Sequence, residues 1–249
     1  MKFSDEGIII SQKKYGENSL IVKVFSHHHG IYRGFVKSAK STKSKAIFQI
    51  GNLISFEFRN RVEENLGQFF SVDLVKSYGT KIIFDRLKLD CMNSLFSIID
   101  STFLERENHQ NLFLYLENFL QKILDENILP KVFLSDYIKL ELKILENLGY
   151  AIDLSSCVVT DSKLDLAFVS PKSARAVSFS AGKEYQNKLL KLPNFLIEEF
   201  AEYDLEHIAE GMILSGFFLE KFLFEEKSFN KNQQHFFYRE NIKKILSKP

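Results

Sequence analysis

Apolar and polar residues alternate along the first 80 residues in a way that predicts β-strands. Asn52–Arg59 shows this most plainly, with an apolar residue at every second position from Ile54 to Phe58. A period of two is expected where one face of a strand is buried and the other is wet. Turn-forming residues divide the segment into five such runs, Gly7–Lys14, Ser19–Phe25, Gly30–Ser38, Asn52–Arg59 and Gly67–Lys76. Five short strands with no long helix between them predict a small closed or partly open barrel, since closure leaves few bare edges.

Helical spacing replaces this alternation from Phe84 onward. Apolar residues recur every three or four positions in three segments, Leu87–Ile99, Leu112–Ile123 and Leu134–Leu148. Gly149 stands where a left-handed helix cap is usual. An irregular stretch, Tyr150–Gly182, precedes further expected helices at Glu184–Lys191, Asp204–Phe224 and Asn232–Leu246. The patterns predict an α+β protein with a barrel domain at residues 1–80 and an α-helical domain at 81–249, the latter holding a small insert at about 150–182.

The net charge of +1 conceals an uneven distribution along the chain. Residues 1–80 hold 12 Lys and Arg against 7 Asp and Glu, whereas the remaining 169 residues hold 21 against 25. A basic first third beside a mildly acidic remainder favours a polyanion-binding module joined to a domain with another role.

The stretch Gly30–Lys45 concentrates this charge, because it holds five cations and no acid. Lys and Arg neutralise phosphates and Ser hydroxyls donate to their oxygens, so a strand that ends in a Ser/Lys loop suits a phosphate backbone. A solvated loop kept soluble by lysine is the alternative. With cations on the neighbouring runs, the candidate DNA-binding residues are Lys23, Arg33, Lys37, Lys40, Lys43, Lys45, Arg59 and Arg61.

A five-stranded barrel with a cationic strand and loop also resembles the OB-fold, which binds single-stranded nucleic acid through a charged groove and stacking aromatics. Tyr32 and Phe35 lie among these cations and are the candidate base-stacking residues. The alternative is that one or both belong to the barrel core.

Metal and catalytic sites find little support in the sequence. Three consecutive histidines, His27–His29, point in alternate directions in an extended segment and indicate a polar turn better than a metal site. The two cysteines, Cys91 and Cys157, are far apart, and Thr160 stands where a CxxC partner of Cys157 would be. No GxSxG, P-loop, GxGxxG or HExxH motif occurs. We therefore expect no cofactor, no zinc and no enzymatic activity.

The two separated cysteines suit a reducing compartment. The N-terminus lacks the pattern of a signal peptide, and no apolar stretch approaches the roughly 18–20 residues that span a bilayer. The expected location is the cytoplasm, with no membrane partner.

Four stretches, in this order, resemble the RecO family of bacterial recombination mediators. They read DEGIIISQKKYGENSLIVKVFS from Asp5, HGIYRGFVKSAKSTKS from His29, KLELKILENLGYAIDLSSC from Lys139 and FVSPKSARAVS from Phe168. The resemblance covers most of the chain and implies an N-terminal OB-fold, a helical remainder and a zinc-finger-like insert. Some relatives carry four cysteines in that insert, whereas this chain retains only Cys157, so the shape carries over but the metal does not.

The resemblance also implies a function and a location, the bacterial cytoplasm with nucleoid association when the protein is active. Family members bind single- and double-stranded DNA, anneal complementary strands, contact the C-terminal tail of the single-stranded-DNA-binding protein SSB, associate with RecR and help place RecA on SSB-coated DNA. Arg33, Lys37 and Lys40 match the family's cations, and Lys139 opens the segment that matches the SSB-tail site. Two other classes stay open: an adaptor that binds SSB or RecR without binding DNA, and a nucleic-acid enzyme that would need Mg²⁺ and a carboxylate cluster.

Overall fold

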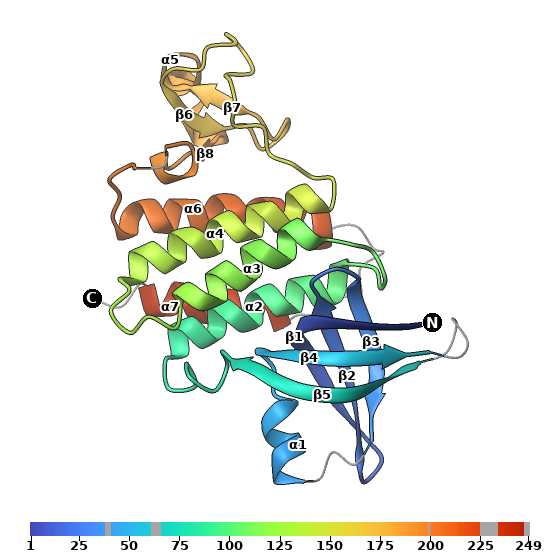
Figure 1. Ribbon diagram of the computed structural model, residues 1–249. Helices are drawn as coiled ribbons and strands as arrows, with labels where there is room; N and C mark the ends of the chain where they lie inside the picture. Colours follow the sequence, from blue (N-terminus) through green and yellow to red (C-terminus); the bar gives the residue numbers. More distant parts are fainter. Residues whose placement is uncertain (38–40, 61–65, 199, 225–233, 247–249) are drawn as a thin grey trace. The chain divides into compact units, whose positions relative to one another are not determined.

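The computed structural model describes residues 1–37, 41–60, 66–198, 200–224 and 234–246. The predicted residues Lys40 and Arg61 lie outside these ranges. The chain forms two compact units, the first made of residues 1–126 and 232–242 and the second of residues 127–231 and 243–249. The first unit holds the barrel together with the helices that follow it directly (Figure 1).

The predicted five-stranded barrel is confirmed. Its strands are β1 (Lys2–Tyr15), β2 (Ser19–Ser26), β3 (Gly30–Val36), β4 (Asn52–Arg59) and β5 (Gly67–Ser77). They close in the order β1-β2-β3-β5-β4, with β4 returning to β1. The β3–β5 pair is parallel and the other pairs are antiparallel. β1 begins five residues earlier than expected, because Lys2–Glu6 pair with the end of β4.

Aromatic rings fill the barrel. Phe56, Phe58 and Phe69 lie inside it, and the Phe58 and Phe69 ring centroids are 5.2 Å apart in an edge-to-face arrangement. Edge-to-face packing suits the quadrupoles of the rings and stabilises such a core beyond the burial of area alone. The inward positions are those that the alternation in β4 predicted.

Two glycines make room for these rings where the barrel closes. Gly34 on β3 lies opposite Gly67 on β5 in the short parallel pair. A Cβ atom on Gly67 would lie 2.0 Å from the Phe58 ring, and one on Gly34 would lie 2.9 Å from the Phe69 ring. Any side chain at either position would collide with the core, so the closure depends on glycine.

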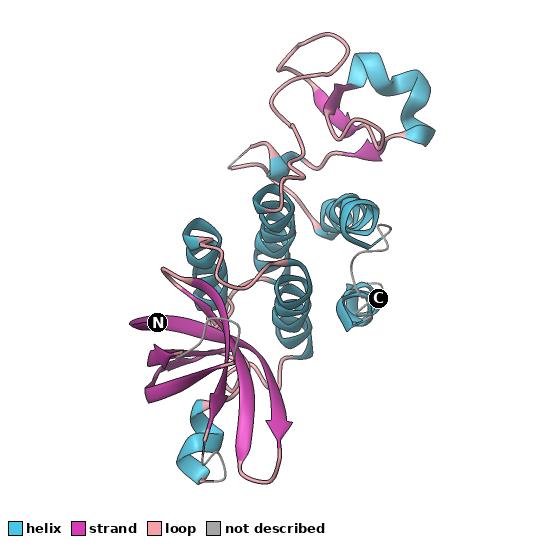
Figure 2. Cartoon of the chain, turned by 90° about the vertical axis from the view of Figure 1, so that its right-hand side faces the viewer, coloured by secondary structure: helices cyan, strands magenta, loops and turns pink. Residues whose placement is uncertain are grey.

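The predicted Ser/Lys loop is wrong in part, since its second half forms the short helix α1 (Thr42–Ile47). The Ser41 side chain caps this helix by accepting a hydrogen bond from the Ser44 amide. Ile47 and Phe48 at its end belong to the barrel core. α1 lies at one end of the barrel (Figure 2). Burying two large apolar side chains, at roughly 1.5–3 kcal/mol each, explains why a Ser- and Lys-rich segment becomes helical here.

Three further helices contribute to the first unit: α2 (Arg86–Thr102), α3 (Gln110–Lys122) and the larger part of α7 (Gln234–Leu246). Asp85 caps α2 by accepting from the Lys88 amide. Phe113 of α3 packs edge-on against Phe25 of β2, with ring centroids 5.5 Å apart. The helices therefore cover part of the outer barrel surface and leave the rest to solvent.

The second unit contains the helices α4 (Pro130–Asn147) and α6 (Leu205–Leu219), followed by a π-helical turn η3 (Glu220–Phe224). α4 ends as the sequence predicts: Gly149 has a φ of 87°, and the Tyr150 amide donates to the Leu145 carbonyl at 2.8 Å. This is the left-handed cap for which glycine is best suited. Asp204 caps α6 by accepting from the amides of Glu206 and His207.

The insert of the second unit is a small three-stranded sheet in the order β7-β6-β8, formed by β6 (Leu166–Val169), β7 (Ala176–Ser178) and β8 (Leu190–Lys191). Figure 2 shows these short strands in magenta. The prediction of a helix at Glu184–Lys191 is wrong. This region holds α5 (Phe179–Gly182), a 3₁₀ helix η1 (Lys183–Lys188) and then β8, because Leu190 and Lys191 pair with β6. A further 3₁₀ turn η2 (Asn194–Leu196) follows.

Candidate nucleic-acid interface

Strand register places one row of outward residues around the barrel, here called the outer belt. Lys13 pairs with Ile21, Ile21 with Phe35, Phe35 with Gln68, Gln68 with Arg59, and Arg59 with Lys2. None of these six residues belongs to the barrel core. The outer belt therefore combines three cations with an aromatic ring on the outside of a closed sheet. Cations with stacking surfaces are the combination that binds single-stranded nucleic acid.

Two aromatic residues that the sequence analysis did not select lie beside the outer belt. The Tyr15 ring is 55% exposed and meets the half-buried Phe35 ring edge-on, with centroids 5.0 Å apart. The Arg59 guanidinium lies 4.6 Å from the centroid of the Phe70 ring. Alternation along β1 could have found Tyr15, since it shares a face with Lys13 and a register row with Ser19 of β2.

The structure corrects the predicted stacking role of Tyr32. Its side chain is 3% exposed and its ring packs against Phe3 and Phe58, each with a centroid distance of 4.9 Å. A ring enclosed in the core cannot stack on a base, so the stacking prediction is wrong for Tyr32. Phe35 has the opposite orientation on the same strand and stays a candidate.

Lys23 and Arg33, adjacent in register on β2 and β3, are held by carboxylates. The Lys23 ammonium lies 2.6 Å from Asp100, and both side chains are 24% exposed. Arg33 lies 3.2 Å from Glu105, just beyond α2. Arg59 and Lys2 share Glu57, and hydrogen bonding to Arg59, against the effect of burial, lowers the Glu57 pKa. These cations already form ion pairs on the barrel surface, so a phosphate would have to compete with the paired carboxylates.

Three predicted cations differ from these because they are exposed and make no ion pair with any residue that the structure describes. Lys37 follows β3, and Lys43 and Lys45 lie on α1. Among the described residues no carboxylate competes for their charges, and these three are here called the unopposed lysines. The candidate phosphate track is thus concentrated on the segment that the sequence analysis selected first.

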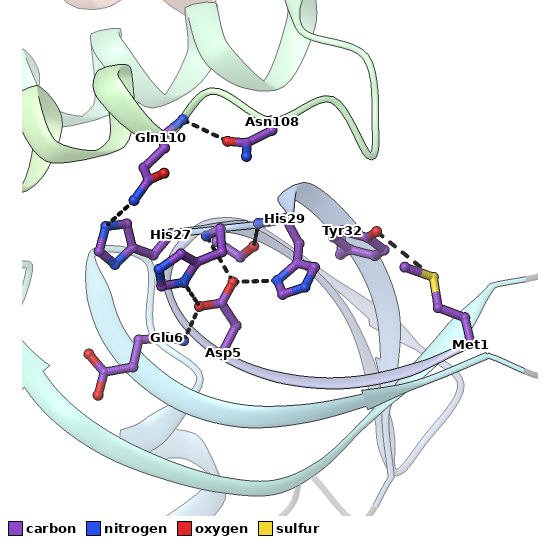
Figure 3. A network of polar contacts seen from close by, with 10 residues as sticks. Met1, Asp5, Glu6, His27, His29, Tyr32, Asn108 and Gln110 are labelled. Atoms are coloured by element: carbon purple, nitrogen blue, oxygen red, sulfur yellow. Dashed lines mark hydrogen bonds and ion pairs between the residues drawn. The ribbon is translucent and has the colours of Figure 1, made fainter.

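The three histidines form the β2–β3 turn, in which His28 and His29 contact a single carboxylate, Asp5 (Figure 3). The ring Nδ1 atoms of His28 and His29 lie 3.0 and 2.8 Å from the two oxygens of Asp5. Asp5 also accepts from the backbone amides of Glu6 and His28. Burial alone would raise the pKa of Asp5, but the hydrogen bonds from His29, His28 and the two amides lower it to about 2. The Nδ1 atoms face a carboxylate, so the turn is polar structure, as the sequence analysis favoured.

Across the described ranges, no group of three or more His, Cys, Asp and Glu side chains is arranged to hold a metal ion. Cys157 in the insert is buried, and its sulfur accepts from the Ser178 amide at 3.2 Å. Burial would raise the pKa of this thiol, but hydrogen bonds from Ser178, Thr160 and Val159 lower it to about 6. The Cys157 sulfur is surrounded by hydroxyl and amide hydrogen-bond donors.

In the second unit, the predicted SSB-tail residue Lys139 lies on α4 and is partly buried. Its ammonium lies 5.9 Å from the centroid of the buried Phe195 ring. Among the described residues, no helix is long and apolar enough to cross a membrane.

Comparison with known proteins decides which family this arrangement represents. A family model described as "Recombination protein O N terminal" matches residues 1–78, and one described as "Recombination protein O C terminal" matches residues 83–225. The chain belongs to the RecO family. The resemblance drawn from the sequence is thereby confirmed.

Individual relatives agree with this assignment. The "DNA repair protein RecO" of Rickettsia felis is 41% identical over 224 residues, which cover 90% of this chain and 92% of the relative. The protein of the same name from Rickettsia canadensis is 39% identical over 236 residues, 95% of each chain. RecO membership places the chain in DNA repair and recombination.

Proposed function

We propose that this RecO-family chain binds single-stranded DNA on the outer barrel surface, anneals complementary strands and helps RecA to load on SSB-coated DNA. The observation that supports the proposal is the set of exposed, unopposed lysines Lys37, Lys43 and Lys45, which follow the outward Phe35 along the chain. The backbone phosphates lie along these lysines, and the bases meet Tyr15 and Phe35. Double-stranded DNA binds the same cations more weakly, because its bases are stacked and unavailable.

Annealing on such a surface needs no chemical step. Two complementary strands repel each other through their phosphates, and a cationic surface that screens both raises the rate at which they meet. Tyr15 and the half-buried Phe35 stack on the bases and leave their hydrogen-bonding edges free to meet a complementary strand. The protein accordingly acts as a mediator and not as an enzyme.

Reversal of the three unopposed charges tests the DNA site. We would measure the anisotropy of labelled single-stranded DNA across salt concentrations for the wild type and for Lys37→Glu/Lys43→Glu/Lys45→Glu. Five phosphate contacts give a log–log salt slope of about −3.5, and loss of three contacts reduces it to about −1.4. Affinity at low salt should fall at least tenfold.

A matched control separates the site from net charge. Lys163, Lys183 and Lys188 are exposed lysines of the insert, and their reversal changes the charge of the chain by the same amount. We expect this control to keep nearly the whole wild-type slope. An unchanged salt slope in the barrel variant, or an equal loss of slope in the control variant, would rule out the proposed site.

The second unit is proposed to hold the acidic SSB tail at Lys139, beside the Phe195 ring. A partly buried cation beside apolar side chains suits an acidic peptide with an apolar end. Lys139→Glu should weaken binding of a labelled SSB-tail peptide about tenfold. Lys143→Glu is the control, because Lys143 already pairs with Glu146 at 2.6 Å. Equal affinity of the wild type and Lys139→Glu would remove this assignment.

In this proposal, association with RecR and loading of RecA follow the binding of DNA and of the SSB tail. The adaptor alternative is distinguished by the same reagents: an adaptor binds the SSB-tail peptide but shows no measurable affinity for oligonucleotides. Turnover of DNA that depends on Mg²⁺ would instead favour an enzyme.

A further inference from the structure

A cleft of about 720 Å³ opens in the first unit between the β1–β2 hairpin, the end of α1 and the start of α2. Its volume falls within the range of small-molecule sites, about 300–1,000 Å³. Apolar side chains provide part of its lining, among them Leu20, Phe48 and Met92. The cleft is therefore large enough for a flat heterocycle and has apolar surface against which such a ring could pack.

Polar groups suited to such a ring line the same cleft. Four amide side chains line it, and within the described ranges they make no side-chain hydrogen bond: Gln12, Asn18, Gln49 and Asn93. An amide both donates and accepts, which is the pattern that Watson–Crick and Hoogsteen edges of bases require. Apolar surface with unpartnered amides matches a nucleobase better than it matches a purely apolar side chain.

Two lysines also line the cleft. Lys14 comes from β1 and Lys45 from α1, and neither makes an ion pair with a described residue. Lys45 is also one of the three unopposed cations of the proposed DNA track, so the cleft is continuous with that track. Glu17 is the one acid in the lining, which leaves the cleft with a net positive charge.

We infer that this cleft receives an unstacked nucleobase of the bound single strand, with the adjoining phosphate at Lys14 and Lys45. The inference rests on the proposed DNA-binding function and adds a base-binding site at one end of it. A single strand can rotate a base out of its stack at little cost, whereas a duplex must break a pair as well. The cleft thereby favours single strands over duplexes independently of charge.

Methionine methyl resonances provide a direct test, because the chain has three methionines and only Met92 lines the cleft. Oligonucleotides of equal length, one with bases and one abasic throughout, would be titrated into protein labelled at the methionine methyls. The base-containing strand should shift the Met92 signal through ring currents, and the abasic strand should leave it nearly in place. Met212, which lies in the second unit, serves as the internal reference.

Substitution of the amides gives the second readout. Wild-type protein should bind the base-containing strand about tenfold more tightly than the abasic strand, since base contacts of this kind matter on that scale. Gln49→Leu/Asn93→Leu should reduce that ratio at least threefold. The control Gln186→Leu/Asn187→Leu makes the same chemical change on the exposed η1 helix and should leave the ratio intact.

The outcomes separate this inference from the proposed function. Normal oligonucleotide binding and salt slope with no Met92 shift would overturn the inference and leave the DNA-binding function standing. A Met92 shift caused by an acidic peptide but not by an oligonucleotide would also overturn it and make the cleft a protein-docking site. Absence of any oligonucleotide binding would remove both.

Discussion

Asp5 is a single carboxylate that organises the whole β2–β3 turn. Its side chain is 3% exposed, and its two oxygens accept from both histidine rings and two backbone amides. A group whose pKa is about 2 in the folded protein and near 3.9 in the unfolded chain stabilises the fold above pH 4 and loses that contribution as the pH falls toward 2.

Asp5→Asn should therefore lower the free energy of unfolding by about 2 kcal/mol at pH 7, and the difference from wild type should shrink between pH 4 and pH 2. Urea unfolding at pH 7, 4 and 2.5 measures it. Asp73→Asn, at an exposed carboxyl on β5, should change little at any pH. A constant gap between Asp5→Asn and wild type across this range would contradict the account.

A second prediction concerns the absence of a Cβ atom at Gly67. Gly67→Ala places a methyl group 2.0 Å from the Phe58 ring and should cost roughly 1–3 kcal/mol of stability through overpacking. Phe58→Leu leaves space at the same spot, so the cost of Gly67→Ala should be smaller in that background. Thermal or urea unfolding of the four proteins in this cycle measures the coupling. Additive effects of the two substitutions would show that the ring and the glycine do not compete for space.

Tyr32 and Phe35 show what the sequence could decide at this scale. Residues three apart on a strand face opposite sides, so one of the two had to point inward. The pattern could not say which, because both are aromatic and the inner and outer surfaces both contain rings. Only the closed barrel, which encloses Tyr32 and leaves Phe35 half-buried, distinguishes the two sides.

Among the elements, α1 marks the limit of local reasoning. Its six residues include two lysines and a serine, and no isolated peptide of that length forms a stable helix in water. The capping serine at Ser41 was a readable signal, but the burial of Ile47 and Phe48 depends on the closed barrel beneath them. The long helices, by contrast, carry enough periodic apolar positions to be predicted from the sequence, and all of α2, α3, α4 and α6 appeared where expected.

The packing of α7 in the first unit makes its stability depend on pH. His235 is 1% exposed, and its Nδ1 lies 2.9 Å from the Ser94 hydroxyl of α2. Burial, reinforced by the charge of Arg239, lowers the pKa of His235 well below its usual value of 6.5. A histidine held neutral in the fold stabilises it above the unfolded pKa, and this contribution is lost as the pH falls below about 6.5.

Wild-type protein should accordingly lose up to about 1.4 kcal/mol of stability per pH unit below pH 6.5 through this one residue. His235→Gln removes the titrating group, so its stability should vary less between pH 7 and pH 5 even though its stability at pH 7 is lower. Chemical unfolding at three pH values tests this. His207→Gln, at a partly exposed helix cap, is the control. Identical pH profiles for wild type and His235→Gln would refute the role of burial.

Over the whole molecule, the proposed DNA binding depends on which cations already pair with acids. The sequence locates the cations of the basic first third, but it could not show that Lys23 and Arg33 face acids. Asp100 and Glu105 lie some 70 residues further along the chain, and only the fold brings them to the strands. Long-range pairing of this kind leaves no periodic signal in the sequence.

Glu105→Gln provides the corresponding test. Release of Arg33 should raise the affinity for single-stranded DNA about two- to fivefold at low salt and make the salt slope steeper by about 0.7. Glu126→Gln removes an exposed acid elsewhere in the unit and should change the affinity much less. If the two variants behave alike, Arg33 gains no phosphate contact when its partner is removed.

α7 has a consequence for how the protein is made. Its larger part belongs to the first unit, yet it is translated after every helix of the second. A ribosome that adds about 5–20 residues per second therefore presents the barrel and α2 for several seconds before His235 exists. Throughout that interval the α2 surface around Ser94 lacks its permanent cover. The unit that emerges first is thus completed only near the end of translation, and its nascent form offers a surface for chaperones to recognise.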